Sequence, residues 1–316
     1  MGTNAAKLLI SELTSGGQLK PLMEERRVTR LGEGVDAHGV LTEGAIERLI
    51  KALGEFQAIA GQWNVEQSVV VGTSASRDTG ALIVDIVRDR TGLYYEIISG
   101  EKEADISFEG AVGGVPHVSG RVICCDIGGG STELVEGTTG GNILHRVSLD
   151  VGSVRISERF FSSQPPNSDE LNAARQFIQS SLAKSSFPKS DAMLLVGASD
   201  THRLLLRLQS RLVAGKIPIE HTINSKWKLL REMDVHHEKL SYSQVKYWVE
   251  LLVQMTFHEV LALDPEELPG RADVFPAALL ICLEVMHCLE KKPVIVSQWG
   301  LAHGIALKIF RDGSIQ

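Results

Sequence analysis

The chain has 316 residues, of which 43% are hydrophobic and 22% are charged, and its 39 acidic side chains outnumber 32 basic ones to leave a net charge of -7. This length predicts two domains, and the composition is typical of an ordered globular protein. The negative balance argues against a nucleic-acid binder and against an electrostatic membrane anchor.

Strands and helices alternate along the first third of the chain. Short apolar runs bounded by glycine or polar residues indicate strands, and apolar side chains at three- and four-residue spacing indicate helices. Strands are expected at 7–12, 28–32, 68–72 and 94–99, and helices at 42–59, 81–90 and 100–112.

A second cycle of strands and helices follows a turn-rich stretch at 113–120, which we interpret as a domain boundary. Strands that alternate with helices predict parallel or mixed sheets covered by helices, so the expected fold class is α/β. Strands are expected at 121–126, 132–136, 144–149, 192–197 and 293–297, and helices at 153–161, 168–185, 241–261, 273–290 and 299–310.

The sequence gives no sign of export or membrane insertion. No apolar window reaches the length of a transmembrane helix, and no basic stretch followed by an apolar run opens the chain. The cysteines have neither zinc-ligand spacing nor the number that a disulfide framework needs, so we interpret them as buried, reduced thiols. These features predict a cytoplasmic protein.

The residues around Asp126 carry the clearest chemical signal. A buried strand at 121–126 ends in that carboxylate, and three glycines at 128–130 then turn the chain tightly. Because glycine has no Cβ, successive N–H groups of such a turn can converge on an anion, and Ser131 adds a hydroxyl. Asp126, with Glu133 acting through water, suits a hard divalent cation. The alternative is a plain glycine-rich hairpin in which Asp126 caps the turn.

A similar turn opens the chain. Gly2, Thr3 and Asn4 precede an apolar strand, much as the glycines at 128–130 do, although these residue types occur in many turns. Two such turns, one in each half of the chain, suggest two related domains that face a shared cleft.

Two helix starts complete the candidate site. Ser74 and Arg77 follow the strand at 68–72, where hydroxyls at a helix N-terminus and a guanidinium suit an anion, although an ordinary cap would look the same. Glu103 lies in the first turn of the helix at 100–112. There it either interacts favourably with the helix dipole or acts as a general base for an attacking water.

A series of short motifs spans nearly the whole chain. They are Gly2-Thr-Asn-Ala-Ala-Lys-Leu-Leu, Arg30-Leu-Gly-Glu-Gly-Val-Asp36, Thr73-Ser-Ala-Ser-Arg77, Ile98-Ser-Gly-Glu-Lys-Glu-Ala104, Asp126-Ile-Gly-Gly-Gly-Ser-Thr-Glu133, Ser148-Leu-Asp-Val-Gly-Ser-Val-Arg155, Leu268-Pro-Gly-Arg-Ala-Asp-Val274 and Ser297-Gln-Trp-Gly-Leu-Ala-His-Gly304. In their order they resemble the motifs of the exopolyphosphatase / guanosine pentaphosphate phosphohydrolase (Ppx/GppA) family.

The resemblance implies a two-domain fold. It is that of the sugar kinase/Hsp70/actin superfamily, with two ribonuclease-H-like domains and an active cleft between them. On this basis residues 1–115 form the first domain and residues 116–297 the second, while the helix at 298–316 crosses back to complete the first. Members of the family often form homodimers.

The resemblance also implies a role for each site residue. Glu103 corresponds to the catalytic base that orients water against the terminal phosphorus. Asp126 and Glu133 correspond to the carboxylates that organise Mg²⁺. The implied phosphate-binding residues are Gly2, Thr3, Asn4, Ser74, Arg77, Gly128, Gly129, Gly130 and Ser131.

The sequence departs from the family pattern in two notable places. The family's first turn is preceded by a strand that ends in Asp, whereas Met1 stands directly before Gly2. We therefore expect a true start upstream, or a first sheet without its central strand. The family's Gly-Gly-Thr loop is represented by residues 196–201, where Asp200 would repel an anion.

The leading interpretation is an exopolyphosphatase that uses Mg²⁺ and an activated water to remove the terminal phosphate of inorganic polyphosphate. A guanosine pentaphosphate phosphohydrolase is the alternative within the family. The departures leave open a catalytically weak protein that binds polyphosphate or guanosine alarmones. An ATP-using kinase on the same fold is disfavoured by the motif at 98–104, and no nucleic-acid or membrane partner is expected.

Overall fold

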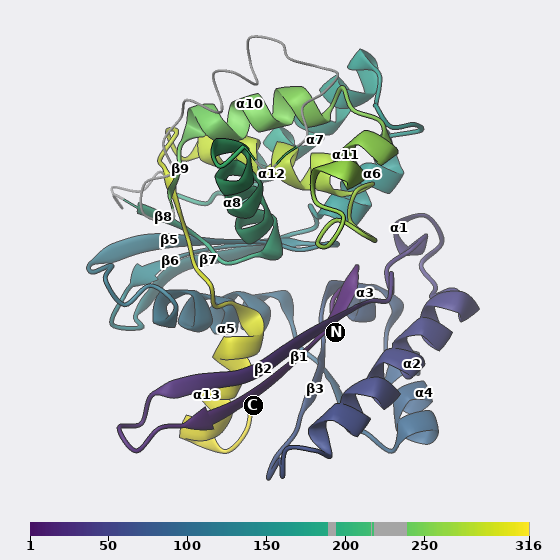
Figure 1. The fold of residues 1–316 in the computed structure, drawn as a ribbon, viewed down its shortest axis with the longest axis vertical. Helices are drawn as coiled ribbons and strands as arrows, with labels where there is room; N and C mark the ends of the chain where they lie inside the picture. The colour runs from purple at the N-terminus through teal and green to yellow at the C-terminus, as the bar shows by residue number, and fades with distance from the viewer. Residues whose placement is uncertain (189–193, 216, 218–238, 316) are drawn as a thin grey trace.

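In a computed structural model of the protein, the chain forms two α/β lobes stacked one above the other (Figure 1). The structure describes residues 1–188, 194–215, 217 and 239–315. The predicted α/β class is confirmed by the mixed sheet of the upper lobe and the helices that cover it. Across the described ranges, no helix is both long and apolar enough to cross a membrane.

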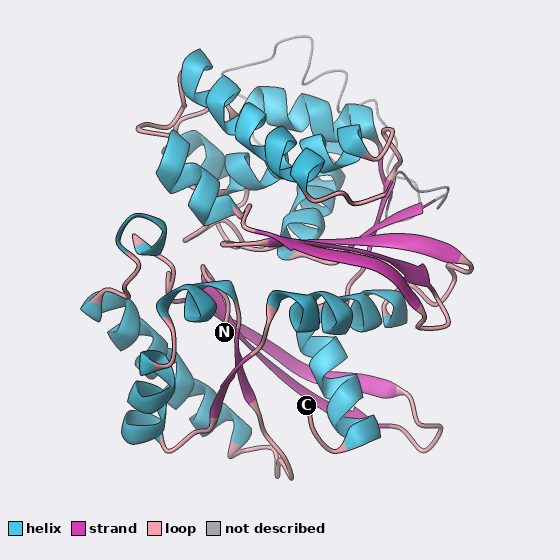
Figure 2. Cartoon of the chain, turned by 180° about the vertical axis from the view of Figure 1, so that it is seen from behind, coloured by secondary structure: helices cyan, strands magenta, loops and turns pink. Residues whose placement is uncertain are grey.

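The N-terminal lobe contains two separate two-stranded sheets with helices around them (Figure 2). Strands β1 and β2 run antiparallel, whereas β3 and β4 run parallel. The strands are β1 (Ala5–Leu13), β2 (Leu19–Val28), β3 (Val70–Gly72) and β4 (Tyr95–Ile97), and the helices are α1 (Val35–His38), α2 (Glu43–Ala60), α3 (Ser74–Thr79), α4 (Leu82–Thr91) and, from the end of the chain, α13 (Leu301–Asp312).

The residues that open the chain connect these two sheets. Met1 hydrogen-bonds to the β3 region, since its amino group donates to the Val71 carbonyl and its own carbonyl accepts from the Thr73 amide. Ala5 then begins β1, so the turn at residues 2–4 leads from one sheet to the other.

The C-terminal lobe is built on a mixed six-stranded sheet in the order β7-β6-β5-β8-β10-β9. The antiparallel unit of β7, β6 and β5 continues into β8 and β10, which run parallel to β5. Its strands are β5 (Arg121–Ile127), β6 (Thr132–Thr138), β7 (Ile143–Leu149), β8 (Leu194–Gly197), β9 (Lys239–Leu240) and β10 (Val294–Val296). Its helices are α6 (Ser153–Phe160), α7 (Ser168–Lys184), α8 (Asp200–Val213), α10 (Tyr242–Leu252), α11 (Phe257–Leu263) and α12 (Phe275–Cys288).

Strand β5 alternates between the two faces of this sheet. Ile123 and Cys125 pack into the large core that includes side chains of α7, α10 and α12, whereas Val122 and Cys124 pack on the opposite face against α5 (Gly100–Gly113). Because side chains of a strand alternate with a period of two, Asp126 shares the α5 face.

Helix α5 joins the two lobes. It packs against β5, β6 and β7 on one side and against α13 on another, and α13 also contacts β1 (Figure 1). The position of α5 therefore depends on α13, near the C-terminus, and α13 in turn packs on β1, near the N-terminus. The domain limits expected at residues 115 and 297 stay a prediction.

Most predicted elements are present, but some details differ. The strand expected at 28–32 is wrong, because β2 ends at Val28 and Arg30 then adopts a left-handed conformation with φ 47°. The helix expected over 241–261 is two helices, because Thr256 caps the start of α11. Cys288 is exposed, although the other three cysteines are buried as expected. The first two residues of the strand expected at 192–197 lie outside the described ranges.

Candidate active site

Helix α5 directs two polar side chains toward the sheet of the C-terminal lobe. Ser99 caps the helix by accepting a hydrogen bond from the Lys102 amide at 3.1 Å. Glu103 and Ser107 lie four residues apart and therefore share one face of the helix. Both are buried, and Glu103 exposes 8% of its surface. Ser99 thus supplies the side-chain cap, and Glu103 is available for another role.

Three polar residues form a row across β5, β6 and β7. Asp126 is directly opposite Glu133 in the register of β5 and β6, and Glu133 is directly opposite Ser148 in that of β6 and β7. Side chains that are directly opposite share one face of a sheet. The Ser148 hydroxyl donates to Glu133 Oε1 at 2.7 Å. The Ser107 hydroxyl of α5 donates to Asp126 Oδ2 at 2.8 Å, so the row faces α5.

Neither serine was identified from the sequence. The sequence does indicate that Ser107 lies near Glu103, because the two residues are four positions apart on a predicted helix. Ser148 opens one of the family motifs, but its position beside Glu133 can be recognised only once the register of β6 and β7 is known.

The three carboxylates lie in buried surroundings and within each other's electric field. Burial, followed by the charges of Glu103 and Asp126, raises the pKa of Glu133 well above its usual range. Burial also raises the pKa of Asp126, although the Ser107 hydrogen bond opposes it. The pKa of Glu103 is likewise raised by burial, against the opposing effect of Arg77. The cluster thus has an excess of buried negative charge, which a cation or a proton would offset.

Replacing Glu133 with glutamine is expected to stabilise the protein at neutral and alkaline pH. Because the folded-state pKa of Glu133 is raised, the native state keeps a proton that the unfolded state releases. Stability therefore falls as pH rises from the ordinary carboxyl range through the folded-state pKa. Glu133→Gln removes this ionisation, so its free energy of unfolding should exceed that of the wild type by about 1 kcal/mol or more at pH 8 and by little at pH 4.5.

Urea unfolding at the two pH values, in the absence of divalent cations, measures this difference. Glu101→Gln serves as the control, since Glu101 lies in helix α5, which packs against β6, but its side chain is 75% exposed. A gain that is the same at both pH values would contradict the repulsion inferred for Glu133.

Arg77 lies in the last turn of α3 and contacts the candidate base directly. Its Nη1 donates to Glu103 Oε2 at 2.6 Å and to the Ile98 carbonyl at 3.1 Å. A guanidinium beside a carboxylate favours the ionised form of that carboxylate. The structure therefore brings Arg77 into the site, while its contact with a phosphate stays a prediction.

The glycine turn after β5 packs closely against the turn at the N-terminus. A Cβ added at Gly129 would lie 2.9 Å from Thr3 Cβ and 3.1 Å from the Asn4 amide nitrogen. A Cβ added at Gly130 would lie 2.4 Å from Ser74 Oγ. Such approach is open only to glycine. The structure therefore brings together the two predicted turns and the start of α3, which lie far apart in the sequence.

The backbone of this turn is oriented by α6. The carbonyl of Gly129 accepts from the Val154 amide at 2.8 Å, and Arg155 Nε donates to the carbonyl of Gly130 at 2.9 Å. Within the described part of the chain, the amides of Gly129 and Gly130 have no backbone partner. Because the carbonyls are engaged by α6, these amides are suited to an anion on the other side of the turn.

Some of the predicted phosphate-binding groups already have protein partners. Asn4 Nδ2 donates to the Gly270 carbonyl at 3.1 Å and so connects the two lobes. The amides of Gly2 and Gly128 close their own turns by donating to carbonyls three residues further on, at 3.0 and 2.9 Å. The phosphate-binding role of these three residues stays a prediction.

The donor set suits a divalent cation that is held by few protein ligands. Mg²⁺ usually keeps several waters and binds one or two carboxylates together with substrate phosphates. Asp126 and Glu133 are directly opposite, and such an ion would offset both the burial and the repulsion that raise the pKa of Glu133. Among the described residues, no group of three or more Asp, Glu, His or Cys side chains could hold a metal ion. The two carboxylates therefore fit an ion whose shell is completed by water and phosphate oxygens.

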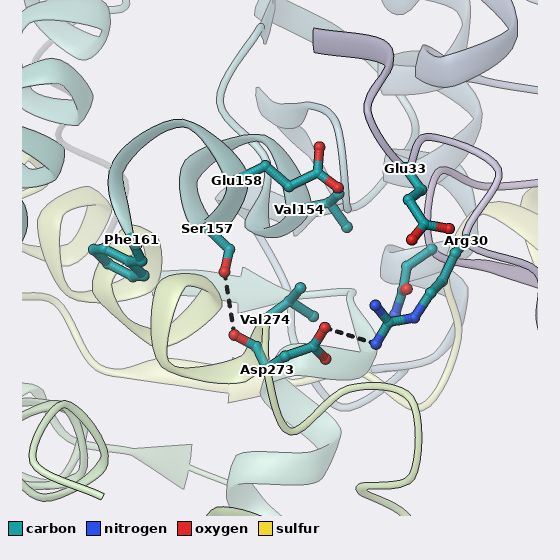
Figure 3. Close-up of a pocket in the computed structure, with 9 residues that line it drawn as sticks. Arg30, Glu33, Val154, Ser157, Glu158, Phe161, Asp273 and Val274 are labelled. Atoms are coloured by element: carbon teal, nitrogen blue, oxygen red, sulfur yellow. Dashed lines mark hydrogen bonds and ion pairs between the residues drawn. The ribbon is translucent and has the colours of Figure 1, made fainter. Parts of the chain in front are cut away.

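A cavity of about 180 Å³ lies beside Asn4, and none of the three clustered carboxylates lines it. Arg30 and Glu33 line it from one lobe, and Glu158 and Asp273 from the other (Figure 3). Arg30 pairs with Asp273 at 2.6 Å, so the remaining charged groups on the cavity wall are carboxylates. This surplus of acid disfavours a polyanionic ligand, and the candidate site for phosphate is the cluster described above.

The strand order, the two lobes and the pair of glycine turns define an α/β protein of the actin-like ATPase superfamily. The chain belongs to the Ppx/GppA phosphatase family, whose model matches residues 9–312. The resemblance inferred from the motifs is thereby confirmed along almost the whole chain.

Relatives of this chain carry both names of the family. Exopolyphosphatase 2 of Mycobacterium tuberculosis is 31% identical over 324 residues, which cover 98% of this chain and 96% of that protein. A guanosine-5'-triphosphate,3'-diphosphate pyrophosphatase of Vibrio atlanticus is 27% identical over 328 residues, which cover 100% of this chain and 60% of that protein. Among solved structures, the PPX-GPPA enzyme of Aquifex aeolicus is similar with a TM-score of 0.72 and 28% identity, over 98% of this chain and 97% of that one.

Proposed function

We propose that the protein is an Mg²⁺-dependent exopolyphosphatase, a hydrolase that removes the terminal phosphate of inorganic polyphosphate. The observation that carries this proposal is the buried Glu103 carboxylate on α5, next to the Asp126–Glu133 pair and the two glycine turns. Family membership and the similarity to the mycobacterial exopolyphosphatase support the same activity.

In this proposal Glu103 acts as the general base. It takes a proton from a water molecule whose oxygen attacks the terminal phosphorus, while the bond from that phosphorus to the bridging oxygen breaks. The shortened chain leaves with the electron pair of that bond. Arg77, at 2.6 Å from Glu103, favours the ionised form that can accept the proton.

The remaining groups hold the reacting phosphate. The amides of Gly129 and Gly130 would donate to its non-bridging oxygens, where charge develops in the transition state. Asp126 and Glu133 would hold Mg²⁺, which neutralises charge on phosphate oxygens when it is bound. Local donors and a cation thus account for polyanion binding by a chain whose net charge is -7.

Phosphate release from long-chain polyphosphate, with Mg²⁺ and with a chelator, tests the proposal. We expect release of orthophosphate with Mg²⁺ and a loss of at least 100-fold when the ion is removed, because the repulsion among the carboxylates returns. Release that persists in the chelator would contradict the metal requirement, and no release under either condition would overturn the activity.

Guanosine pentaphosphate is the second candidate substrate, because the Vibrio relative is named for a guanosine nucleotide. The chemistry at the terminal phosphate would be the same, so a comparison of kcat/KM for the two substrates decides between them. Binding of either compound without release would instead identify the catalytically weak binding protein. A homodimer and a cytoplasmic location stay predictions.

A further inference from the structure

Basic side chains from both lobes surround one carboxylate beside the candidate active site. Asp200 Oδ1 pairs with Lys7 Nζ at 2.7 Å and with the Arg203 guanidinium, and its Oδ2 pairs with Arg271 Nη2 at 2.9 Å. Lys7 belongs to β1 of the N-terminal lobe, whereas Asp200 begins α8 of the C-terminal lobe. We call the four basic residues Lys7, Arg26, Arg203 and Arg271 the cation cluster.

The cation cluster is unfavourable without an anion. Lys7 and Arg26 are directly opposite each other in the register of β1 and β2, where like charges destabilise an antiparallel pair. Burial, followed by the Arg271 charge, lowers the pKa of Arg26. Asp200 is not the only carboxylate here, because Glu24 lies within the field of Lys7 and Arg203, and Glu267 within that of Arg26. Three negative charges thus face four positive ones, which leaves a surplus of one positive charge.

Asp200 is ionised under all ordinary conditions. Burial alone would raise its pKa, but the charges of Lys7, Arg203 and Arg271 outweigh that effect and hold the pKa well below its usual range. The carboxylate therefore acts as a permanent counter-anion inside the cation cluster. Its neutral amide analogue would leave the same cations without their charge partner.

The cation cluster adjoins the candidate active site. Strand β8 runs parallel beside β5, so Asp200, just past the end of β8, lies at the same edge of the sheet as Asp126. Burial raises the pKa of Asp126, but the charges of Lys7 and Arg203 act on the same carboxylate and lower it. Lys7 remains 41% exposed, so the cluster is accessible to a ligand.

We propose that Asp200 is a specificity-determining residue: it occupies the cation cluster as an internal counter-anion that the non-terminal phosphates of a substrate chain must displace. This inference rests on the proposed polyphosphatase function. The terminal phosphate binds at the glycine turns, and the phosphates behind it reach Lys7, Arg203 and Arg271 only by replacing the carboxylate. Asp200 therefore limits how tightly a long chain is held, while orthophosphate, which occupies the turns alone, is unaffected.

Equilibrium binding of tripolyphosphate and of orthophosphate, in Mg²⁺-free buffer and on a Glu103→Gln background, tests this role. Asp200→Asn should lower the Kd for tripolyphosphate at least tenfold and change that for orthophosphate less than twofold. Asp169→Asn is the matched control, because Asp169 is an exposed carboxylate in the first turn of α7 and its loss changes the net charge equally. An unchanged Kd for tripolyphosphate, or an equal gain for both ligands, would overturn the proposal.

A second variant covers the case in which Asp200→Asn does not fold. Lys7→Met removes one cation and leaves Asp200 paired with Arg203 and Arg271, so the fold should persist. Its Kd for tripolyphosphate should rise at least threefold, whereas Lys20→Met, which removes an exposed lysine paired with Glu12, should leave the Kd unchanged. Equal affinities of these two lysine variants would also reject the inference.

These binding measurements are independent of turnover. If Asp200→Asn tightens binding of tripolyphosphate while the wild-type protein releases no phosphate, only the proposed activity would be refuted. Phosphate release by the wild type together with unaltered binding in the Asp200 variant would refute the role of Asp200 alone.

Discussion

Replacing Glu103 with glutamine should abolish phosphate release while polyphosphate remains bound. Glutamine keeps the shape of the side chain and an oxygen for the Arg77 guanidinium, but it cannot accept the proton of the attacking water. Loss of a positioned general base is expected to lower kcat by about 10²–10⁴-fold. The Kd for tripolyphosphate should stay equal or fall, because one negative charge leaves a site that binds an anion.

The matched control for this variant is Glu101→Gln. Glu101 lies in the same first turn of α5, but its side chain is 75% exposed and its ion pair with Arg146 spans 3.6 Å. We expect this variant to retain kcat within twofold. A loss of less than tenfold in Glu103→Gln, measured at saturating polyphosphate and Mg²⁺, would show that another group takes the proton.

Parts of the site could be predicted from the sequence because their signals are local. Asp126 ends a predicted buried strand, three glycines follow, and Glu133 is the second residue of the next strand, so a hairpin of this kind brings the two carboxylates opposite each other. The local signal of Glu103 was ambiguous, since an acidic residue in a first helical turn also favours the helix dipole. The family resemblance, and not helix chemistry, selected it as the base.

Features that depend on tertiary pairing could not be predicted in this way. The residues Glu24-Glu25-Arg26-Arg27 have no strand signal, yet they lie in β2 because β1 pairs with them. Lys7 and Asp200 are separated by most of the chain, and no spacing rule relates them. In sequence, Asp200 is a residue that would repel an anion, whereas the structure gives it three cationic partners.

Replacing Gly304 with alanine should destabilise the protein and slow the reaction, although this residue lies on α13 and not on the phosphate turns. A Cβ at Gly304 would lie 2.0 Å from the Ile106 carbonyl oxygen, and one at Gly110 would lie 2.2 Å from the Gly300 carbonyl oxygen. Helices α5 and α13 are thus in direct backbone contact. A methyl group must push them apart, at a cost of about 1–3 kcal/mol. Because the added Cβ would meet backbone atoms rather than the end of a flexible side chain, we expect the upper part of this range, which exceeds the roughly 1 kcal/mol that alanine gains over glycine within a helix.

The same displacement should reach the chemistry, because Ile106 lies one turn from Glu103 on α5. A shift of about 1 Å in a catalytic group can lower a rate by about 10²-fold, so kcat should fall together with the free energy of unfolding. Gly54→Ala is the control, since Gly54 is exposed in the middle of α2 and its added Cβ would meet no heavy atom within 4 Å. That variant should gain about 0.5–1 kcal/mol and keep full activity. The same chemical change thus has opposite signs at the two glycines, and equal stability of the two variants in urea unfolding would show that α13 does not hold α5 in place.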